Sequence, residues 1–181
     1  KRHIIYVAPY QSIIDQNAEE IRRAIHNDEI VLEHHCNVIH DDERERIRYE
    51  ILTENWDSPI IVTTAVQFLN TLFASGIGNI RRMYSILNSV IIFDEVQALP
   101  VKITKLFNLS VNFLTAFGKS TVVLCSATQP LFDELDENRL LPPLSMAGNP
   151  KEYAEEADLR QKNYKSLSGT RRRRLNKFLS L

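Results

Sequence analysis

The sequence of 181 residues predicts an α/β domain in which a parallel β-sheet is flanked by helices. Two apolar runs carry this prediction, Val90–Phe93 and residues 121–125. Continuous apolar runs of this length are typical of strands buried on both faces of a parallel sheet. A third observation is that residues 12–25 place apolar side chains at helical spacing directly after another strand-like run.

The first half of the chain predicts three strands and three helices. Ser12 is a candidate N-cap for the first helix, because Asp15 follows it at capping-box spacing. The charged segment 41–55 carries only a thin apolar stripe, which indicates an exposed helix. The expected strands are residues 3–8, 30–39 and 60–63, and the expected helices are residues 12–25, 41–55 and 64–74.

The second half predicts a loop at residues 76–79, then the Val90 strand. A strongly apolar helix is expected after Pro100, with Gly118 as its C-cap residue. The strand at residues 121–125 follows. Several prolines mark a looser region after it, and a short helix is expected at residues 152–159.

Charge is unevenly distributed along the chain. Residues 160–181 hold eight Lys or Arg side chains and no acid, while the other residues hold 14 basic against 23 acidic ones. A basic tail of this kind indicates either contact with nucleic acid or a solvated terminus. The two cysteines suggest no disulfide framework, so a reducing, cytoplasmic compartment is expected. No apolar run is long enough to span a membrane and no signal peptide is visible.

A group of potential metal ligands lies in and after the second expected strand. We reject it as a metal site, because the paired spacing typical of zinc sites has no second half here. Adjacent His34 and His35 would also point to opposite faces of a strand. The group comprises His34, His35, Cys36, His40, Asp41 and Asp42.

Polar motifs follow both of the buried strands. Asp94 and Glu95 come directly after Phe93, and Ser126-Ala127-Thr128 follows the last strand. Ligands of open α/β folds bind at the carboxyl ends of the strands, so these motifs indicate a nucleotide site. The alternative for the acidic pair is a helix N-terminus, whose dipole favours carboxylates.

These motifs resemble motifs II and III of superfamily 2 helicases. Longer segments resemble motifs of the helicase part of the CRISPR-associated helicase–nuclease of type I systems, over residues 3–145. The segments are FDEVQALP (93–100), LCSATQP (124–130), YVAPYQSIIDQNAE (6–19) and IIVTTAVQFLNTLF (60–73). The resemblance implies a RecA-like P-loop NTPase domain over residues 1–145, followed by a C-terminal extension over residues 146–181.

The resemblance also implies roles for individual residues, with ATP and Mg²⁺ as cofactors. Asp94 would hold Mg²⁺ through water, and Glu95 would orient or deprotonate the attacking water. Gln97 stands where many relatives have Asp or His, and its amide would link this site to motif III. Ser126 and Thr128 would couple hydrolysis to movement of a second lobe.

Motifs Ia and Ib imply contacts with single-stranded DNA. The candidate residues are Pro9, Tyr10 and Gln11 in the first motif and Thr63 and Thr64 in the second. The alternatives are an ordinary strand–helix connection for the first motif and helix capping for the second. A CRISPR effector complex and a chain that supplies the missing second lobe are the other expected partners.

The sequence contains no phosphate loop of the form G-x-x-x-x-G-K-[ST]. We therefore expect an incomplete RecA-like domain that lacks the Walker A strand, is a fragment or part of a split helicase, and is inactive by itself. The loss of that strand would leave residues 121–125 with an open, apolar edge. The alternative function is a non-catalytic module that binds nucleic acid or docks on an effector complex, and a helicase outside CRISPR systems is a third possibility.

Overall fold

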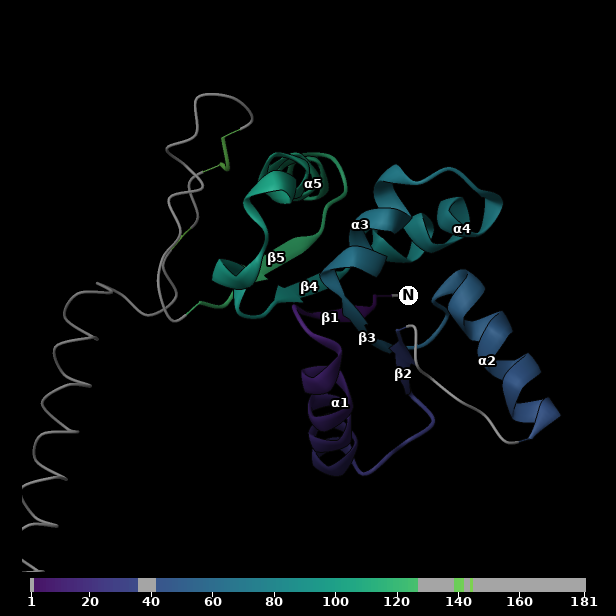
Figure 1. Cartoon of the computed structure of the whole chain (residues 1–181). Helices are drawn as coiled ribbons and strands as arrows, with labels where there is room; N and C mark the ends of the chain where they lie inside the picture. Colours follow the sequence, from purple (N-terminus) through teal and green to yellow (C-terminus); the bar gives the residue numbers. More distant parts are fainter. Residues whose placement is uncertain (1, 36–41, 127–138, 142–143, 145–181) are drawn as a thin grey trace, which may run out of the picture. The chain divides into compact units, whose positions relative to one another are not determined.

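The computed structural model describes residues 2–35, 42–126, 139–141 and 144. The chain divides into two units, residues 1–141 and 142–181, and the description below concerns the first. Its centre is one sheet of five parallel strands in the order β2-β3-β1-β4-β5 (Figure 1). The predicted α/β fold with a parallel sheet is confirmed. The strands are β1 (Ile4–Ala8), β2 (Val31–His34), β3 (Ile60–Thr64), β4 (Val90–Phe93) and β5 (Thr121–Leu124).

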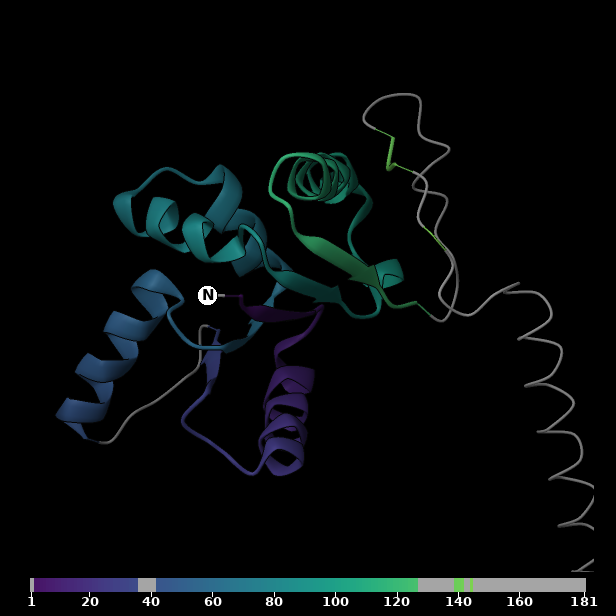
Figure 2. The ribbon, with the colours of Figure 1, turned by 180° about the vertical axis from the view of Figure 1, so that it is seen from behind.

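Helices lie on both faces of the sheet. In Figures 1 and 2, α1 lies on one face, whereas α3, α4 and α5 lie on the opposite face. Two short 3-10 helices, η1 (Val96–Ala98) and η2 (Val101–Ile103), lead from β4 into α5. The α-helices are α1 (Gln11–Ile25), α2 (Glu43–Asn55), α3 (Ala65–Phe73), α4 (Ile77–Ile86) and α5 (Thr104–Ala116). In the part of the chain that the structure describes, no helix is long and apolar enough to cross a membrane.

The main core lies between the sheet and the α3–α5 face. A row of buried aromatic rings runs through it, formed by Trp56, Phe68, Phe93 and Phe107. The rings of Phe68 and Phe93 meet edge to face at a centroid distance of 5.0 Å, and those of Phe93 and Phe107 at 4.9 Å. Because Phe93 is the last residue of β4, this row fixes the end of the strand from which Asp94 emerges.

A smaller core lies beneath α1. Ile14 and Ala18 of this helix are fully buried against Ala8 and Val62 of the neighbouring strands. Side chains alternate between the two faces along each strand, so β1 sends Ile5 to the main core and Tyr6 to the α1 side. This alternation decides which side chains reach each side of the site described below.

Several helix ends differ from the sequence predictions. The N-cap of α1 is Tyr10 in extended conformation, and Ser12 lies inside the helix, so the predicted Ser12 cap is wrong. The predicted loop at residues 76–79 is also wrong, because α4 begins at Ile77. Gly118 follows the C-cap residue Phe117 of α5 rather than forming the cap itself. A Cβ atom there would lie 2.7 Å from the carbonyl oxygen of Leu114, so the close approach requires glycine.

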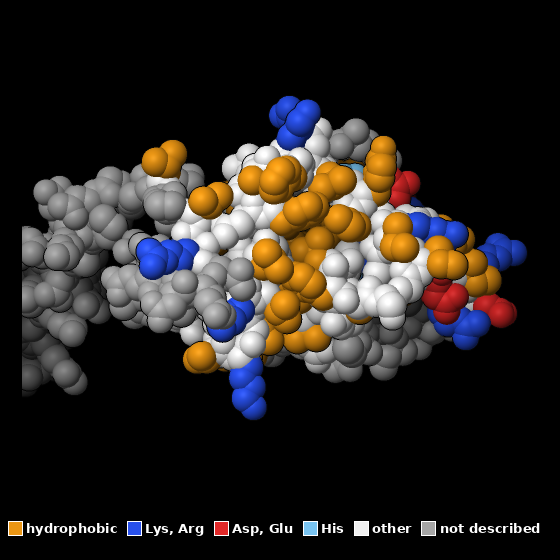
Figure 3. Space-filling model, turned by 90° about the horizontal axis from the view of Figure 1, so that it is seen from above, with side chains coloured by type: hydrophobic (Ala, Val, Ile, Leu, Met, Phe, Trp, Pro, Cys, Tyr) orange, Lys and Arg blue, Asp and Glu red, His pale blue; other side chains and the backbone are white. Residues whose placement is uncertain are grey.

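Strand β5 ends the sheet among the described residues, because only β4 pairs with it. This agrees with the open edge that the sequence predicted. The helical face next to it carries a broad band of exposed apolar side chains (Figure 3). The exposed apolar residues of α3, α4 and α5 are Val66, Phe73, Ile77, Ile80, Tyr84, Leu106, Leu109 and Phe113.

Candidate functional site

The candidate site lies in the turn that follows β4, at the carboxyl edge of the sheet. The backbone N–H of Asp94 donates to the carbonyl of Val7 in β1 over 2.9 Å. The N–H of Val96 donates to the carbonyl of Cys125, which follows β5, over 3.1 Å. The turn is thereby fixed to both neighbouring strands, as expected for a polar motif at the end of a buried parallel strand.

Asp94 accepts hydrogen bonds at both carboxylate oxygens. The Tyr6 hydroxyl donates to Oδ2 over 2.5 Å, and the backbone N–H of Glu95 donates to Oδ1 over 3.0 Å. Asn17 of α1 in turn donates to the Tyr6 hydroxyl over 2.9 Å. Burial, and then the hydrogen bond to Asp94, raise the pKa of Tyr6 above its ordinary value. Tyr6 therefore stays a protonated donor, and Asp94 is held as the acceptor.

Glu95 has a left-handed backbone conformation, with φ 49° and ψ 47°. A non-glycine residue in this region is strained, and such residues are concentrated at functional sites. The conformation turns the chain sharply between Asp94 and η1, so that two adjacent carboxylates leave the strand end in different directions. Separate directions allow the two groups to serve different partners.

The Gln97 side chain lies between Glu95 and Ser126. Its Nε2 donates to the Glu95 carboxylate, and its Oε1 accepts from the Ser126 hydroxyl over 2.6 Å. Since Ser126 follows β5, this bridge joins the polar motifs of two neighbouring strands. Thr128, the other expected coupling residue, lies outside the described residues.

Sequence reasoning missed three members of this network, Tyr6, Asn17 and Cys125. Burial, followed by the carboxylates of Asp94 and Glu95, raises the pKa of the Cys125 thiol, so the thiol stays neutral. The neutral thiol is a weaker nucleophile than the thiolate. Only its position next to Ser126 hinted at the site, whereas Tyr6 and Asn17 reach it through strand pairing that the local sequence does not show.

The two segments expected to touch nucleic acid follow neighbouring strands at the same edge. Ala8 of β1 stands opposite Thr64 of β3, so Pro9, Tyr10 and Gln11 begin beside the start of α3. Tyr10 is 57% exposed. Thr64 caps α3 by accepting from the N–H of Gln67 over 3.1 Å, which bears out its expected capping geometry.

Thr63 is the other residue that was expected to contact phosphate. Its side chain is fully buried, and its hydroxyl donates to the carbonyl of His34 over 2.8 Å. Strand β3 is buried at all five positions, including its last two. The hydroxyl thus joins β3 to the end of β2, and the role of Thr63 in binding phosphate stays a prediction.

The two adjacent histidines point to opposite faces of β2, as predicted. His34 accepts at Nδ1 from the Trp56 indole over 3.2 Å within the main core, and burial lowers its pKa to about 4. His35 instead approaches Asp15 of α1. Asp42 caps α2 by accepting from the N–H of Arg44 over 2.9 Å. Cys36, His40 and Asp41 lie outside the described residues.

The donor set after β4 fits a hard divalent cation such as Mg²⁺. Asp94 offers carboxylate oxygens whose hydrogen bonds leave lone pairs free, and Mg²⁺ prefers oxygen ligands and keeps several of its waters. A family model described as DEAD/DEAH box helicase matches residues 1–137 of the chain. A comparison with curated proteins found no match.

Proposed function

The chain belongs to the DEAD/DEAH box helicase family, and from this premise we propose that it is part of an ATP-dependent DNA helicase of CRISPR interference. Helicases of this family are nucleic-acid-dependent ATPases that use ATP and Mg²⁺. The observation that supports the proposal best is the bridge from the Asp94–Glu95 turn through Gln97 to Ser126. The four helicase-like segments of the sequence support the CRISPR assignment, and we place the protein in the cytoplasm.

In this proposal the two carboxylates have different tasks. Asp94, whose carboxylate accepts from Tyr6 and from the Glu95 N–H, would hold Mg²⁺. The ion, when bound, neutralises charge on the phosphates. Glu95 would orient or deprotonate the attacking water. Phosphoryl transfer depends mainly on positioning and electrostatic stabilisation, so the strained but fixed turn suits the task.

Gln97, Ser126 and Thr128 transmit the state of the nucleotide to a second lobe. The Gln97 amide donates to Glu95 and accepts from Ser126, so a change at Glu95 during hydrolysis would be passed to Ser126. This coupling requires an intact side-chain bridge.

Single-stranded DNA is the proposed nucleic-acid partner, and a CRISPR effector complex is the proposed protein partner. Pro9, Tyr10, Gln11 and the N-terminus of α3 at Thr64 form the contact edge. A helix N-terminus offers backbone N–H groups to a phosphate, and an exposed aromatic ring offers a stacking surface to a base.

The 181 residues carry no phosphate loop. We therefore propose that the carboxylate site works only when a phosphate loop and a second lobe are supplied, and that the chain alone hydrolyses ATP poorly. Calorimetry of the chain with Mg-ATP and Mg-ADP tests this. The control variant is Glu50→Gln, which removes an exposed carboxylate from α2.

Weak nucleotide binding that is lost in Asp94→Ala and kept in Glu50→Gln supports a nucleotide site that requires a phosphate loop and a second lobe for activity. Rapid Mg²⁺-dependent turnover by the chain alone, abolished in Glu95→Gln, would contradict the proposed inactivity. Absence of any binding by a folded chain would contradict the nucleotide site. Capture of a target-bound CRISPR effector complex by the immobilised chain, compared with a complex lacking target DNA, tests the partner.

The exposed Tyr10 ring favours a second candidate, a non-catalytic module that binds single-stranded nucleic acid. In that case the chain binds oligonucleotides without nucleotide, and the affinity falls steeply with salt because phosphates provide most contacts. Tyr10→Ala lowers this affinity, and deletion of residues 170–181 flattens the salt dependence if the basic tail takes part. Equal oligonucleotide affinity of the parent chain, Tyr10→Ala and the chain without residues 170–181 would count against this candidate.

A further inference from the structure

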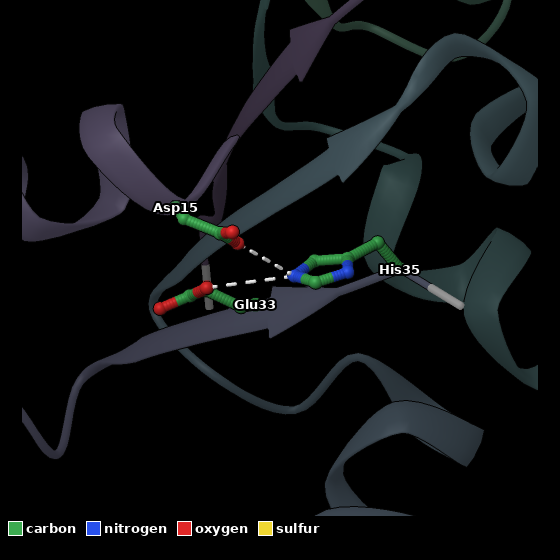
Figure 4. A group of neighbouring side chains, drawn as sticks. All are labelled: Asp15, Glu33 and His35. Atoms are coloured by element: carbon green, nitrogen blue, oxygen red, sulfur yellow. Dashed lines mark ion pairs between the residues drawn. The ribbon is translucent and has the colours of Figure 1, made fainter. Parts of the chain in front are cut away.

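Three potential metal ligands from two elements converge beside the first helix. They are Asp15 of α1, Glu33 of β2 and His35 directly after β2 (Figure 4). His35 Nε2 lies 3.1 Å from Asp15 Oδ1 and 3.6 Å from Glu33 Oε2. All three ligand atoms lie within 4.8 Å of one another. This cluster is separate from the Asp94 turn, since β2 and β4 are three positions apart in the sheet.

The topology of the fold explains the convergence. Glu33 and His35 are two residues apart along an extended segment, so both face the side of the sheet that α1 covers. Helix α1 starts at the carboxyl edge of the sheet after β1, and the parallel strand β2 ends at that edge. The second turn of α1 therefore lies beside the end of β2, which brings Asp15 to His35.

The distances suit a small divalent ion. Ligand atoms about 2.0–2.1 Å from a tetrahedral Zn²⁺ are about 3.3 Å apart. The two measured separations from His35 Nε2, 3.1 and 3.6 Å, lie on either side of that value. The ligand atoms of the two carboxylates lie within 4.8 Å of each other, and Asp15 can move closer because its side chain is 68% exposed.

The surroundings are those of a supported site with an open side. The side chains of His35 and Glu33 are 5% and 17% exposed, whereas Asp15 lies at the surface, where an ion can enter. Arg22 pairs with the other Glu33 oxygen, Oε1, and orients the carboxylate. The two carboxylates and Arg22 together carry one net negative charge, which favours a cation.

We propose that Asp15, Glu33 and His35 bind a first-row divalent metal ion, for which Zn²⁺ is the best probe. Mixed imidazole and carboxylate ligands suit Zn²⁺, whereas Mg²⁺ prefers oxygen ligands alone in octahedral geometry. The bound ion ties the second turn of α1 to the end of β2. The three protein ligands leave a fourth position for water.

The competing explanation is an ion pair in which protonated His35 contacts the two carboxylates without any metal. Zinc calorimetry on the full chain, stripped of metal by a chelator and without nucleotide, separates the two. The informative variant is Asp15→Asn, which removes a ligand at an exposed position and therefore spares the fold. Glu19→Gln is the matched control, because Glu19 is an exposed carboxylate one turn further along α1 that pairs with Arg23.

We expect a single equivalent of Zn²⁺ to bind the chain and to raise its Tm, with excess Mg²⁺ unable to displace it. Loss of an outer-shell partner lowers metal affinity by about 10–100-fold, so Asp15→Asn should weaken binding by at least about tenfold. Glu19→Gln should bind as the parent does. Equal affinity of both variants, or no zinc binding by the parent chain, would overturn the proposal. The outcome is independent of the nucleotide site, because neither variant touches Asp94 or Glu95.

Discussion

At the scale of single residues, the candidate site depends on side chains that arrive from distant parts of the sequence. Tyr6 and Asn17 reach Asp94 from β1 and α1, and Ser126 reaches Glu95 through Gln97. Each of these groups is both a partner of a carboxylate and a part of the fold. Substitutions here should therefore change stability in a way that depends on protonation.

Tyr6→Phe removes the hydroxyl that donates to Asp94 and accepts from Asn17. We expect the free energy of unfolding at pH 7 to fall by about 1.5–3 kcal/mol, as for hydrogen bonds to charged groups. The raised pKa of Tyr6 means that the folded state holds the phenolic proton more tightly than the unfolded state. Its stabilising contribution is complete below pH 10 and is lost as the pH rises above 10.

Urea unfolding of both proteins between pH 8 and pH 11 measures this effect. Subtracting the variant's free energy of unfolding from that of the parent removes the contributions of the other tyrosines and of the lysines, which titrate in the same pH range. A constant difference across the whole range would show that the hydroxyl does not couple to Asp94.

His34→Asn tests the buried histidine of the main core. The pKa of His34 is lowered to about 4, which means that the folded state binds the neutral imidazole ring more favourably than the protonated one. Its contribution is complete above pH 6.5 and is lost as the pH falls towards 4, which removes at most about 3 kcal/mol. Asparagine can accept from the Trp56 indole without titrating, so the variant should be less stable at pH 7 but less sensitive to acid.

The matched control is His26→Asn. His26 is exposed and has a left-handed backbone conformation that asparagine tolerates, so the parent acid sensitivity should persist. The measurement is urea unfolding at intervals between pH 4 and pH 7. Parent-like acid sensitivity in the His34 variant would mean that other groups cause it.

At the scale of elements, strand and helix types were largely predictable, and their ends were not. The apolar runs of β3, β4 and β5 are continuous, so the positions of these strands follow from the local sequence. Their burial does not: β3 is buried throughout, but β4 is fully buried only at alternate positions and the edge strand β5 at none, so the expectation that residues 121–125 are buried on both faces is wrong. Helix α4 escaped prediction because Gly76 and Gly78 resemble a loop, yet Gly76 only provides the φ of 140° that starts the helix. Ser12 was a good cap by residue type, but the turn after Pro9 starts the helix one residue earlier.

The candidate site likewise contains residues that the local sequence predicts and residues that it does not. Asp94, Glu95, Gln97 and Ser126 stand within polar motifs at strand ends, where local sequence is informative. The cluster of Asp15, Glu33 and His35 depends on how α1 packs beside β2, which no local pattern records. The local sequence also did not show that the strand end at Thr63 is buried.

Two glycines of this chain give a matched pair of substitutions. Gly118→Ala places a Cβ 2.7 Å from the Leu114 carbonyl oxygen, so we expect the free energy of unfolding to fall by about 1–3 kcal/mol through overpacking. Gly78→Ala meets nothing within 4 Å and lies inside α4, so it should be neutral or stabilise by up to about 1 kcal/mol. Thermal and urea unfolding of the two variants test the pair, and similar destabilisation of both would refute the steric argument.

At the scale of the whole molecule, we expect the edge strand β5 to promote association between chains at high concentration. Its backbone is paired on one side only among the described residues. Val122 and Leu124 pack against the main core, so Val123 points to the opposite face. An edge strand with apolar side chains is a template for pairing with another chain.

Val123→Lys places a charge on this edge without entering the main core. We expect it to reduce light scattering during refolding at high concentration and to leave the Tm nearly unchanged, since a lysine on an edge strand blocks pairing between chains. Val122→Lys is the contrasting variant, because Val122 is partly buried against the main core and a lysine there should lower the Tm. Unchanged scattering in the Val123 variant would place the aggregation-prone surface elsewhere.

The order of the strands also determines how long β1 waits for its pairing partners during synthesis on the ribosome. Among the described strands, β1 is the earliest in the sequence and lies in the middle of the sheet, where Ile4 pairs with Ile60 on one side and with Val90 on the other. At about 5–20 residues per second, the second partner emerges roughly 4–17 s after β1. No hairpin can shelter β1 in the interval, since each described strand pair is parallel and requires a long crossover. A nascent chain that pauses before residue 90 therefore presents the central strand of the domain, with one edge still open, to chaperones and to neighbouring chains.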